Sequence, residues 1–354
     1  SGTYKGIAKR MHNSLRPQNH MVIECDFKQT KVQSFAPLDW QSATREACVD
    51  FVKNAGIVGL GGAGFPTYVK YMKPDGVDYV LINAVECEPY ITADYRSVMD
   101  DAKDLVTGAK IMKKMAEAKT VYICIKESHP DLIEKVKSVL TDAAGVEVRP
   151  VPDVYPMGWE RVLVREVLHK EYGGLPAEAG AIIGNASSAI AIAKAFEKGE
   201  AITQKNLTVS GECVKDPHNV CVPVGMPVSE IIEACGGYTQ DTVRLISGGP
   251  MMGKTIVNDM FVVDRAMNAL TVLPAANDDA IACLRCGKCS DHCPSGLQPV
   301  RITAALKAND VDEMSKRGVM SCIECGMCTY ICPSHIDVTE NVRKAKRIVM
   351  LKKK

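Results

Sequence analysis

A cysteine-rich segment occurs twice near the C-terminal end of the sequence. Residues 283–294 read CLRCGKCSDHCP, and 39 residues later positions 322–333 read CIECGMCTYICP. Each copy has the spacing C-x2-C-x2-C-x3-C-P, in which three closely spaced thiolates bind irons of one [4Fe–4S] cubane. In two-cluster ferredoxins the fourth cysteine, just before the proline, binds the other cluster. The repeat therefore predicts a domain built around two [4Fe–4S] clusters.

The repeat divides its eight cysteines into two crossed ligand sets. One cluster is predicted to be bound by Cys283, Cys286, Cys289 and Cys332, and the other by Cys322, Cys325, Cys328 and Cys293. Zinc ribbons and structural disulfides are the alternatives, because paired C-x2-C spacing also suits zinc. Zinc needs four ligands per site and has no use for a third cysteine before C-P. The helical segments between and after the copies resemble the helical ferredoxin modules of multi-subunit oxidoreductases.

Composition excludes several other classes of protein. The 354 residues are 46% hydrophobic and 24% charged, which are globular proportions. The net charge of +1 lacks the basic surplus of a nucleic-acid-binding protein, so no nucleic-acid partner is expected. No window reaches the roughly 18–20 apolar residues that a membrane span needs. The remaining seven of the 15 cysteines are scattered singly, which indicates a protein of a reducing, cytoplasmic compartment.

The chain divides into four stretches. Residues 1–36 contain short extended segments, and residues 37–200 alternate predicted helices with apolar runs at 78–85, 120–126 and 145–151. This alternation is typical of an α/β fold with a parallel sheet. The first helix is expected to begin at Asp39 and to end at Gly56. Residues 201–274 read as a small β-grasp unit, and residues 275–354 hold the cluster motifs.

A glycine-rich loop follows the first predicted helix. Residues 59–70 read GLGGAGFPTYVK, with four glycines in six residues. A Rossmann dinucleotide fingerprint would have to follow a strand, so that interpretation fails here. Exposed backbone N–H groups, and the positive end of a helix after Pro66, favour phosphate binding instead. Lys70 would lie one turn into that helix and reach the same anion; a plain turn is the alternative.

A polar segment follows the apolar run at 78–85. Residues 83–96 read NAVECEPYITADYR. Ligands of parallel sheets bind outside the carboxyl ends of the strands. Asn83, Glu86 and Glu88 therefore stand where carboxylates could accept hydrogen bonds from ribityl or ribose hydroxyls, or from a flavin N–H. A solvated turn is the alternative for this segment.

Together these segments resemble a known family. The glycine loop followed by NAVECEP is similar to the flavin-bearing, NADH-oxidising subunit of respiratory complex I. The closer resemblance is to the RnfC family, a component of the Rnf complex, which is the ferredoxin:NAD oxidoreductase of bacterial membranes. Segments at 155–164, 173–195, 222–237 and 245–253 also match, so the likeness covers nearly the whole chain. Residues 1–36 resemble the end of that family's N-terminal barrel-sandwich (biotinyl-like) domain, whose first part would then be absent, and residues 201–274 resemble its SLBB-type unit.

The resemblance implies bound FMN, with NAD(H) as substrate. By position, FMN would be held by Gly59, Gly61, Gly62, Gly64, Lys70, Asn83, Glu86, Asn185 and Ser188. Phe65, Glu88 and Glu160 would face the nicotinamide nucleotide. The flavin would carry the redox chemistry, so no catalytic acid–base residue is predicted.

The implied function is electron transfer between NAD(H), FMN and the two clusters. The implied location is the inner face of the cell membrane, as a peripheral subunit. Its implied partners are a ferredoxin-like iron–sulfur subunit and membrane subunits.

Two departures from the family patterns keep alternatives open. Val85 stands where the complex I pattern has an acidic residue, and Trp159 stands where Rnf subunits usually have glycine. The GWER segment at 158–161 also resembles a soluble RnfC-like protein that delivers electrons to clostridial proline reductase. A second alternative is a cluster relay subunit that no longer binds NADH, for which Trp159 is the only support.

Overall fold

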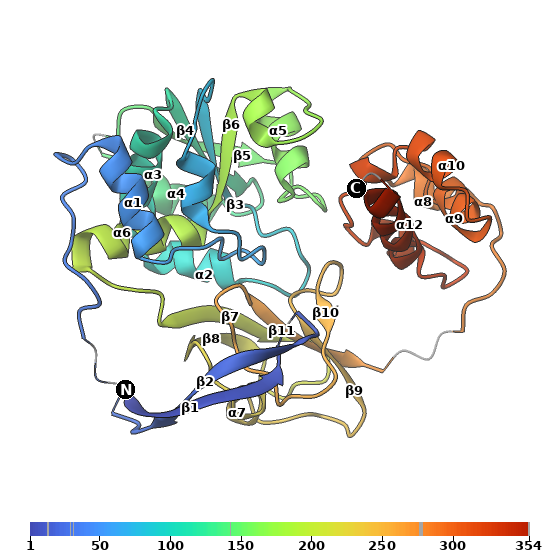
Figure 1. Ribbon diagram of the computed structural model, residues 1–354, viewed down its shortest axis with the longest axis horizontal. Helices are drawn as coiled ribbons and strands as arrows, with labels where there is room; N and C mark the ends of the chain where they lie inside the picture. Colours follow the sequence, from blue (N-terminus) through green and yellow to red (C-terminus); the bar gives the residue numbers. More distant parts are fainter. Residues whose placement is uncertain (13, 29, 31, 142, 276–278, 353–354) are drawn as a thin grey trace. The chain divides into compact units, whose positions relative to one another are not determined.

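The computed structural model in Figure 1 describes residues 1–12, 14–28, 30, 32–141, 143–275 and 279–352. They fall into two units, of which the first comprises Ser1–Gly249 and Lys254–Pro274. The second comprises Pro250–Gly253 and Ala275–Lys354. The predicted segments 1–36, 37–200 and 201–274 belong to the first unit except for residues 250–253, and the boundaries between the segments stay predictions.

A four-stranded parallel sheet forms the centre of the first unit's α/β part. Its order is β5 (Val146–Val151), β4 (Thr120–Lys126), β3 (Tyr79–Ala84) and β6 (Ala181–Asn185). The predicted parallel sheet is thereby confirmed, with the three apolar runs as three of its strands. The chain builds outward from β3 to β4 and β5, then returns to the opposite side of β3. Asn83 and Asn185 lie opposite each other in register at this switch point.

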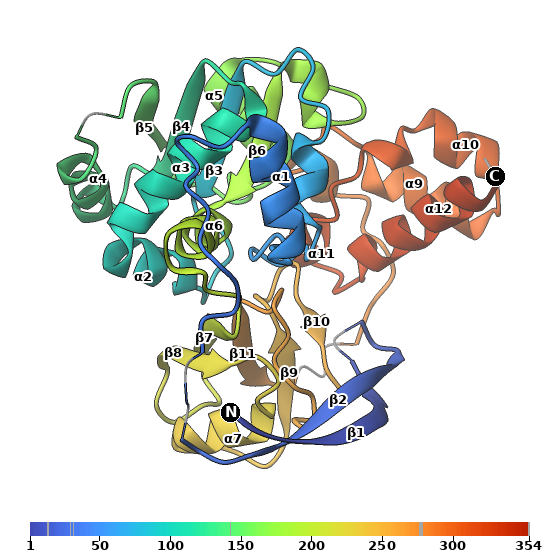
Figure 2. The same cartoon turned by 60° about the vertical axis from the view of Figure 1, so that its left-hand side comes forward.

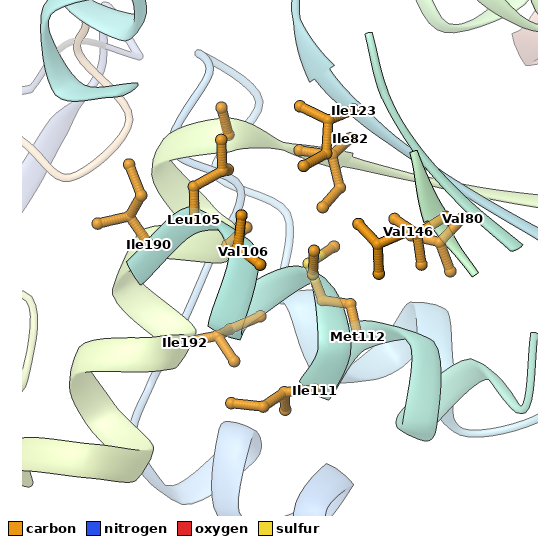
Figure 3. Close-up of a cluster of buried hydrophobic side chains, with 14 of the residues drawn as sticks. Val80, Ile82, Leu105, Val106, Ile111, Met112, Ile123, Val146, Ile190 and Ile192 are labelled. Atoms are coloured by element: carbon orange, nitrogen blue, oxygen red, sulfur yellow. The ribbon is translucent and has the colours of Figure 1, made fainter. Parts of the chain in front are cut away.

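Helices connect and cover these strands. They are α1 (Arg45–Asn54), α2 (Ala93–Asp100), α3 (Ala102–Ala116), α4 (Pro130–Ser138), α5 (Glu160–Leu168) and α6 (Ala186–Lys198), with a short 3-10 helix η2 (Pro176–Ala179). Figure 3 shows Met112 of α3 near Val80 and Val146 of the sheet, within one buried apolar cluster. At Gly108, an added Cβ would lie 2.0 Å from the Ala189 carbonyl oxygen, so α3 and α6 cross closely.

Two local predictions in this region were wrong. The first helix begins at Arg45 rather than Asp39, because the Thr44 side chain caps it by accepting the Ala47 N–H at 3.2 Å. The Asp39 carboxylate instead accepts hydrogen bonds from Gln41 N and Ser42 Oγ in a preceding turn. After Pro66 the chain forms only a five-residue 3-10 helix, η1 (Thr67–Tyr71), and not an α-helix.

The rest of the first unit is β-rich. A hairpin joins β1 (Gly2–Met11) to β2 (Pro17–Cys25). A five-stranded sheet has the order β10 (Lys254–Thr255), β9 (Val243–Ser247), β11 (Ala269–Pro274), β7 (Gln204–Ser210) and β8 (His218–Pro223), and α7 (Val228–Ala234) packs on it (Figure 2). The β11–β7 pair is parallel and the others are antiparallel, which is the mixed sheet expected of a β-grasp unit.

The second unit is helical, as predicted. Its helices are α8 (Lys288–Asp291), α9 (Pro299–Lys307), α10 (Val311–Lys316), η3 (Val319–Ser321), α11 (Met327–Tyr330) and α12 (Val338–Lys352). Ile302 and Val342, both at most 1% exposed, belong to its buried core. Of the helices in the described ranges, none is long and apolar enough to cross a membrane.

Candidate functional site

The glycine loop of the first unit folds back on itself. The Gly59 N–H donates to the Phe65 carbonyl at 2.8 Å, and the Gly64 N–H donates to the Gly59 carbonyl at 3.0 Å. Gly62 and Gly64 have φ of +105° and +61°, which disfavour any residue with a Cβ. Gly61 and Gly62 are exposed. The loop therefore presents glycine backbone at its surface.

The loop is held against the N-terminal end of α6. The Ser188 hydroxyl accepts the Leu60 N–H at 2.9 Å and donates to the Val58 carbonyl at 3.2 Å. A Cβ on Gly61 would lie 2.7 Å from Nδ2 of Asn185. The structure thus brings together four of the predicted flavin residues, Gly59, Gly61, Asn185 and Ser188. A glycine surface beside a helix N-terminus fits a phosphate-bearing ligand such as FMN.

Asn185 joins the loop to a buried carboxylate. Its Oδ1 caps α6 by accepting the Ser188 N–H at 3.3 Å, and its Nδ2 donates to Asp94 Oδ2 at 2.6 Å. The Ser187 hydroxyl donates to the other oxygen of Asp94 at 2.5 Å. Asp94, which is only 8% exposed, thereby links α2 to the end of β6.

The Glu86 carboxylate lies at the N-terminal end of α2. The residue has φ of +45°, and its carboxylate accepts the N–H groups of Asp94 at 2.8 Å and Tyr95 at 3.0 Å. Burial, and then the charge of Asp94, raise the pKa of Glu86 to about 7 against the opposing effect of these hydrogen bonds. Glu86 is therefore partly protonated near neutral pH.

Asn83 ties the end of β3 to the turn that precedes Trp159. Its Nδ2 donates to the Gly158 carbonyl at 2.6 Å, and its Oδ1 accepts the Val85 N–H at 3.1 Å. A Cβ on Gly158 would approach Cys87 Sγ to 3.1 Å. Burial raises the pKa of Cys87 to about 11, so this thiol stays protonated at neutral pH.

Lys70 and Glu160 form an ion pair with a separation of 3.0 Å. The Lys70 ammonium also donates to the Ile183 carbonyl of β6 at 2.8 Å. The side chain predicted to reach a phosphate is thus engaged at the carboxyl end of the sheet.

The other two residues predicted to face the nucleotide are Phe65 and Glu88. Phe65 is 45% exposed at the end of the loop. The Glu88 carboxylate lies against Gly249, where a Cβ would be 2.5 Å from Oε2. The glycine at position 249 leaves room for this carboxylate.

Sequence reasoning missed Asp94 and Lys205. Lys205 of β7 is 5% exposed, and its ammonium donates to the Leu60 carbonyl of the glycine loop at 2.7 Å. Burial lowers the pKa of Lys205, and the carboxylates of Asp94, Asp264 and Glu86 oppose this shift. The signal that could have found it is strand alternation, which places Lys205 on the inward face with Leu207 and Val209.

In the second unit, four cysteines line one cavity. They are Cys293 of the first motif and Cys322, Cys325 and Cys328 of the second, which is the crossed set predicted for one cluster. Burial raises the pKa of Cys328 to about 11 and also raises the pKa values of Cys322 and Cys325. These thiols would therefore release protons on binding metal.

Two hydrogen bonds join the segments that flank Cys283 and Cys332 of the other predicted set. The Ile281 N–H donates to the Ser334 carbonyl at 3.1 Å, and the Ser334 hydroxyl donates to the Ala282 carbonyl at 3.2 Å. These bonds join the residues before Cys283 to the residues after Cys332. Cys283 and Cys286 are exposed, and Cys289 is partly buried.

The two motifs share one backbone conformation. Arg285 and Glu324, at equivalent positions, have φ of +55° and +57°, and their N–H groups donate to Sγ of the cysteine two residues earlier at 3.4 Å. All 15 cysteines are free, which counts against structural disulfides. Among the described residues, no set of three or more Cys, His, Asp or Glu converges on a single metal ion. The thiolates of a cubane bind different irons and are spaced more widely than that.

Three segments of the chain match known domain families. Residues 52–194 match the Nuo51 FMN-binding domain, residues 206–255 the SLBB domain, and residues 275–333 a 4Fe-4S dicluster domain. The chain therefore carries FMN-binding and 4Fe-4S dicluster domains. The NAD+-reducing [NiFe]-hydrogenase in its H2-reduced state is similar in fold, with a TM-score of 0.58 and 15% identity over 90% of this chain and 64% of that one.

Several curated relatives, all RnfC-type components of larger complexes, are similar in sequence. The one from the Na(+)-translocating ferredoxin:NAD(+) oxidoreductase complex of Acetobacterium woodii is 34% identical, over 100% of this chain and 82% of its own length. The one from the proton-translocating complex of Clostridium ljungdahlii is 34% identical, over 84% and 67% of the two chains. The one from the ion-translocating oxidoreductase complex of Rhodobacter capsulatus is 37% identical, over 79% and 56%. The chain therefore belongs to the RnfC family of the ion-translocating Rnf oxidoreductase complexes.

Proposed function

We propose that this chain exchanges electrons between NAD(H), bound FMN and two [4Fe–4S] clusters, as the RnfC component of a ferredoxin:NAD oxidoreductase complex. The Acetobacterium and Clostridium relatives are named as subunits of such complexes. The partners would be a ferredoxin-like iron–sulfur subunit and membrane subunits. The site of assembly would be the cytoplasmic face of the membrane.

One observation carries the flavin part of this proposal. The glycine loop, Asn185 and Ser188 meet at the switch point of the parallel sheet, where Asn83 and Asn185 are in register. Open α/β sheets bind their ligands at such a point, outside the carboxyl ends of the strands. The same chain carries two cysteine motifs with the spacing of two-cluster ferredoxins.

The residues of the site would act by holding ligands. Loop N–H groups and the start of α6 would bind the FMN phosphate. Bound FMN would supply the exchange between two-electron hydride transfer and one-electron transfer to the clusters. Asn83 and Glu86 fix the segments after β3, while the Lys70–Glu160 pair lies beside β6. Phe65, Glu88 and Glu160 would contact the nicotinamide nucleotide.

The test is NADH oxidation by the purified chain, with ferricyanide as electron acceptor and FMN and iron measured on the same sample. The proposal expects one FMN, about eight irons per chain for two clusters, and NADH-dependent reduction of ferricyanide. A preparation that retains both cofactors but does not oxidise NADH would support the cluster relay instead, with Trp159 closing the nucleotide site. A preparation without flavin, even after incubation with FMN, would contradict the proposal.

A further inference from the structure

The two halves of the cysteine repeat differ in charge at three positions of the motif, and only at Arg285 and Glu324 does the charge change sign. Glu324 lies between Cys322 and Cys325, and its carboxylate pairs with two cations of α12. Its Oε1 is 3.0 Å from the Lys346 ammonium, and its Oε2 is 3.1 Å from Nε of Arg343. We call Glu324, Arg343 and Lys346 the α12 clamp.

Lys346 also contacts the cysteine motif itself. Its ammonium donates to the Cys322 carbonyl at 2.8 Å, and its side chain is 21% exposed. The α12 clamp thus sets one carboxylate against two cations, and Arg343 is shared with Glu340, whose Oε2 lies 3.9 Å from its Nη1.

The first half of the repeat lacks this arrangement. A helix follows each motif, and these two helices begin at Pro299 and Val338. The two starts are 39 residues apart, which is also the spacing of the motifs. By this spacing Glu324, Arg343 and Lys346 correspond to Arg285, Ala304 and Lys307. Position 285 is an arginine and offers no carboxylate to a cation, and Lys307 is exposed.

We propose that the Lys346 ammonium raises the reduction potential of the cluster bound by Cys322, Cys325, Cys328 and Cys293. Reduction adds one electron to the cluster and makes or breaks no bond, so a neighbouring cation stabilises the reduced state. The charge is partly buried and is therefore screened less than a surface charge. This inference rests on the two-cluster part of the proposed function, and not on FMN or NAD(H).

The experiment is an anaerobic redox titration of the full chain with dithionite and mediators, followed by electron paramagnetic resonance. Each cluster gives a one-electron wave. In Lys346→Met we expect one wave to move to lower potential. At a fixed potential the ratio of oxidised to reduced cluster should rise roughly tenfold, which corresponds to about 59 mV for one electron. In Glu324→Gln the same wave should move to higher potential, because a negative charge is lost. Lys307→Met is the matched control and should leave that wave unchanged.

Opposite shifts in these two variants separate a charge effect from a structural one. If both variants move the wave in the same direction, if neither moves it, or if Lys346→Met moves both waves equally, the proposal is wrong. If Lys346→Met does not retain iron, the test depends on two other variants. The proposal then requires an upward shift in Glu324→Gln and an unchanged wave in Lys346→Arg, and it is wrong if either result is absent. Dithionite supplies the electrons, so a failure of NADH oxidation would not affect this result.

Discussion

At the scale of single residues, the polar side chains predicted to hold FMN already have partners within the protein. Glu86 accepts two N–H groups of α2, Asn83 donates to Gly158, and Lys70 pairs with Glu160. Asn83 and Glu86 could be predicted because they follow an apolar run at a sheet edge, and Lys70 because it follows the glycine loop. Their partners could not be predicted, because some lie far away in the sequence, as in the bond from Lys70 to Ile183, 113 residues later.

Gly61→Ala tests the close approach of the loop to α6. We expect FMN affinity to fall at least about tenfold, which is roughly 1.4 kcal/mol, because the new Cβ would displace the Asn185 cap. Fluorescence titration of FMN into the apoprotein measures this. Gly173→Ala is the control, since its Cβ would meet only Glu178 Oε2 at 3.9 Å. Equal affinities in the two variants would contradict the assignment.

The raised pKa of Glu86 predicts a pH dependence of stability. Its folded value of about 7 exceeds the ordinary 4.5, so the folded state binds more protons than the unfolded state between these values. The Glu86 contribution therefore falls as pH rises through this window, by on the order of 1–3 kcal/mol. Glu86→Gln should flatten the change in urea midpoint between about pH 5 and about pH 8. Glu127→Gln, at an exposed position, is the control and should leave this change in urea midpoint as it is in the wild type. If Glu86→Gln shows the same change as the wild type, the prediction is wrong.

At the scale of elements, long apolar runs were predicted more accurately than short strands and the starts of helices. The runs at 78–85, 120–126 and 145–151 are β3, β4 and β5 within one residue at each end. The strand β6 has only five residues and is followed at once by α6, and it was not predicted as a strand. The first helix was predicted to begin at Asp39 because Asp is a common N-cap residue. Thr44 is also a common N-cap residue, and it is the one that caps the helix.

Lys205→Met tests the link between β7 and the glycine loop. The variant should bind FMN about tenfold more weakly, because a hydrogen bond from a charged group is worth about 1.5–3 kcal/mol and Leu60 loses it. Thermal stability should change little, since removing a buried charge offsets the lost bond. Lys198→Met, which breaks only the surface pair with Asp104, is the control. Unchanged FMN binding in Lys205→Met would show that the loop does not depend on this lysine.

Paired cysteine variants test the crossed ligand sets. If the sets are crossed, Cys283→Ser with Cys293→Ser removes a ligand from both clusters, and iron should fall from about eight to near zero per chain. Cys293→Ser with Cys322→Ser removes two ligands from one cluster and should leave about four irons. Uncrossed sets would give the reverse result. Iron analysis of anaerobic preparations distinguishes the two arrangements.

At the scale of the whole molecule, the sequence contains three matched domain families in one chain of 354 residues. The cofactor types could be predicted because cysteine spacing and glycine clusters are local patterns. The charge difference between Arg285 and Glu324 is visible in the repeat, but the contact of Lys346 with the second motif is not. That contact depends on the packing of α12, which brings Lys346 to the carbonyl of Cys322, 24 residues earlier.

The most direct test of the whole account is anaerobic NADH reduction of the purified chain, with flavin and cluster absorbance recorded together. We expect NADH to bleach both in the wild-type protein. In Gly61→Ala preparations that are shown to lack FMN, dithionite should still bleach the clusters while NADH should not. Bleaching of the clusters by NADH in flavin-free protein would contradict the account. Wild-type protein that contains FMN and clusters but responds only to dithionite would contradict it as well.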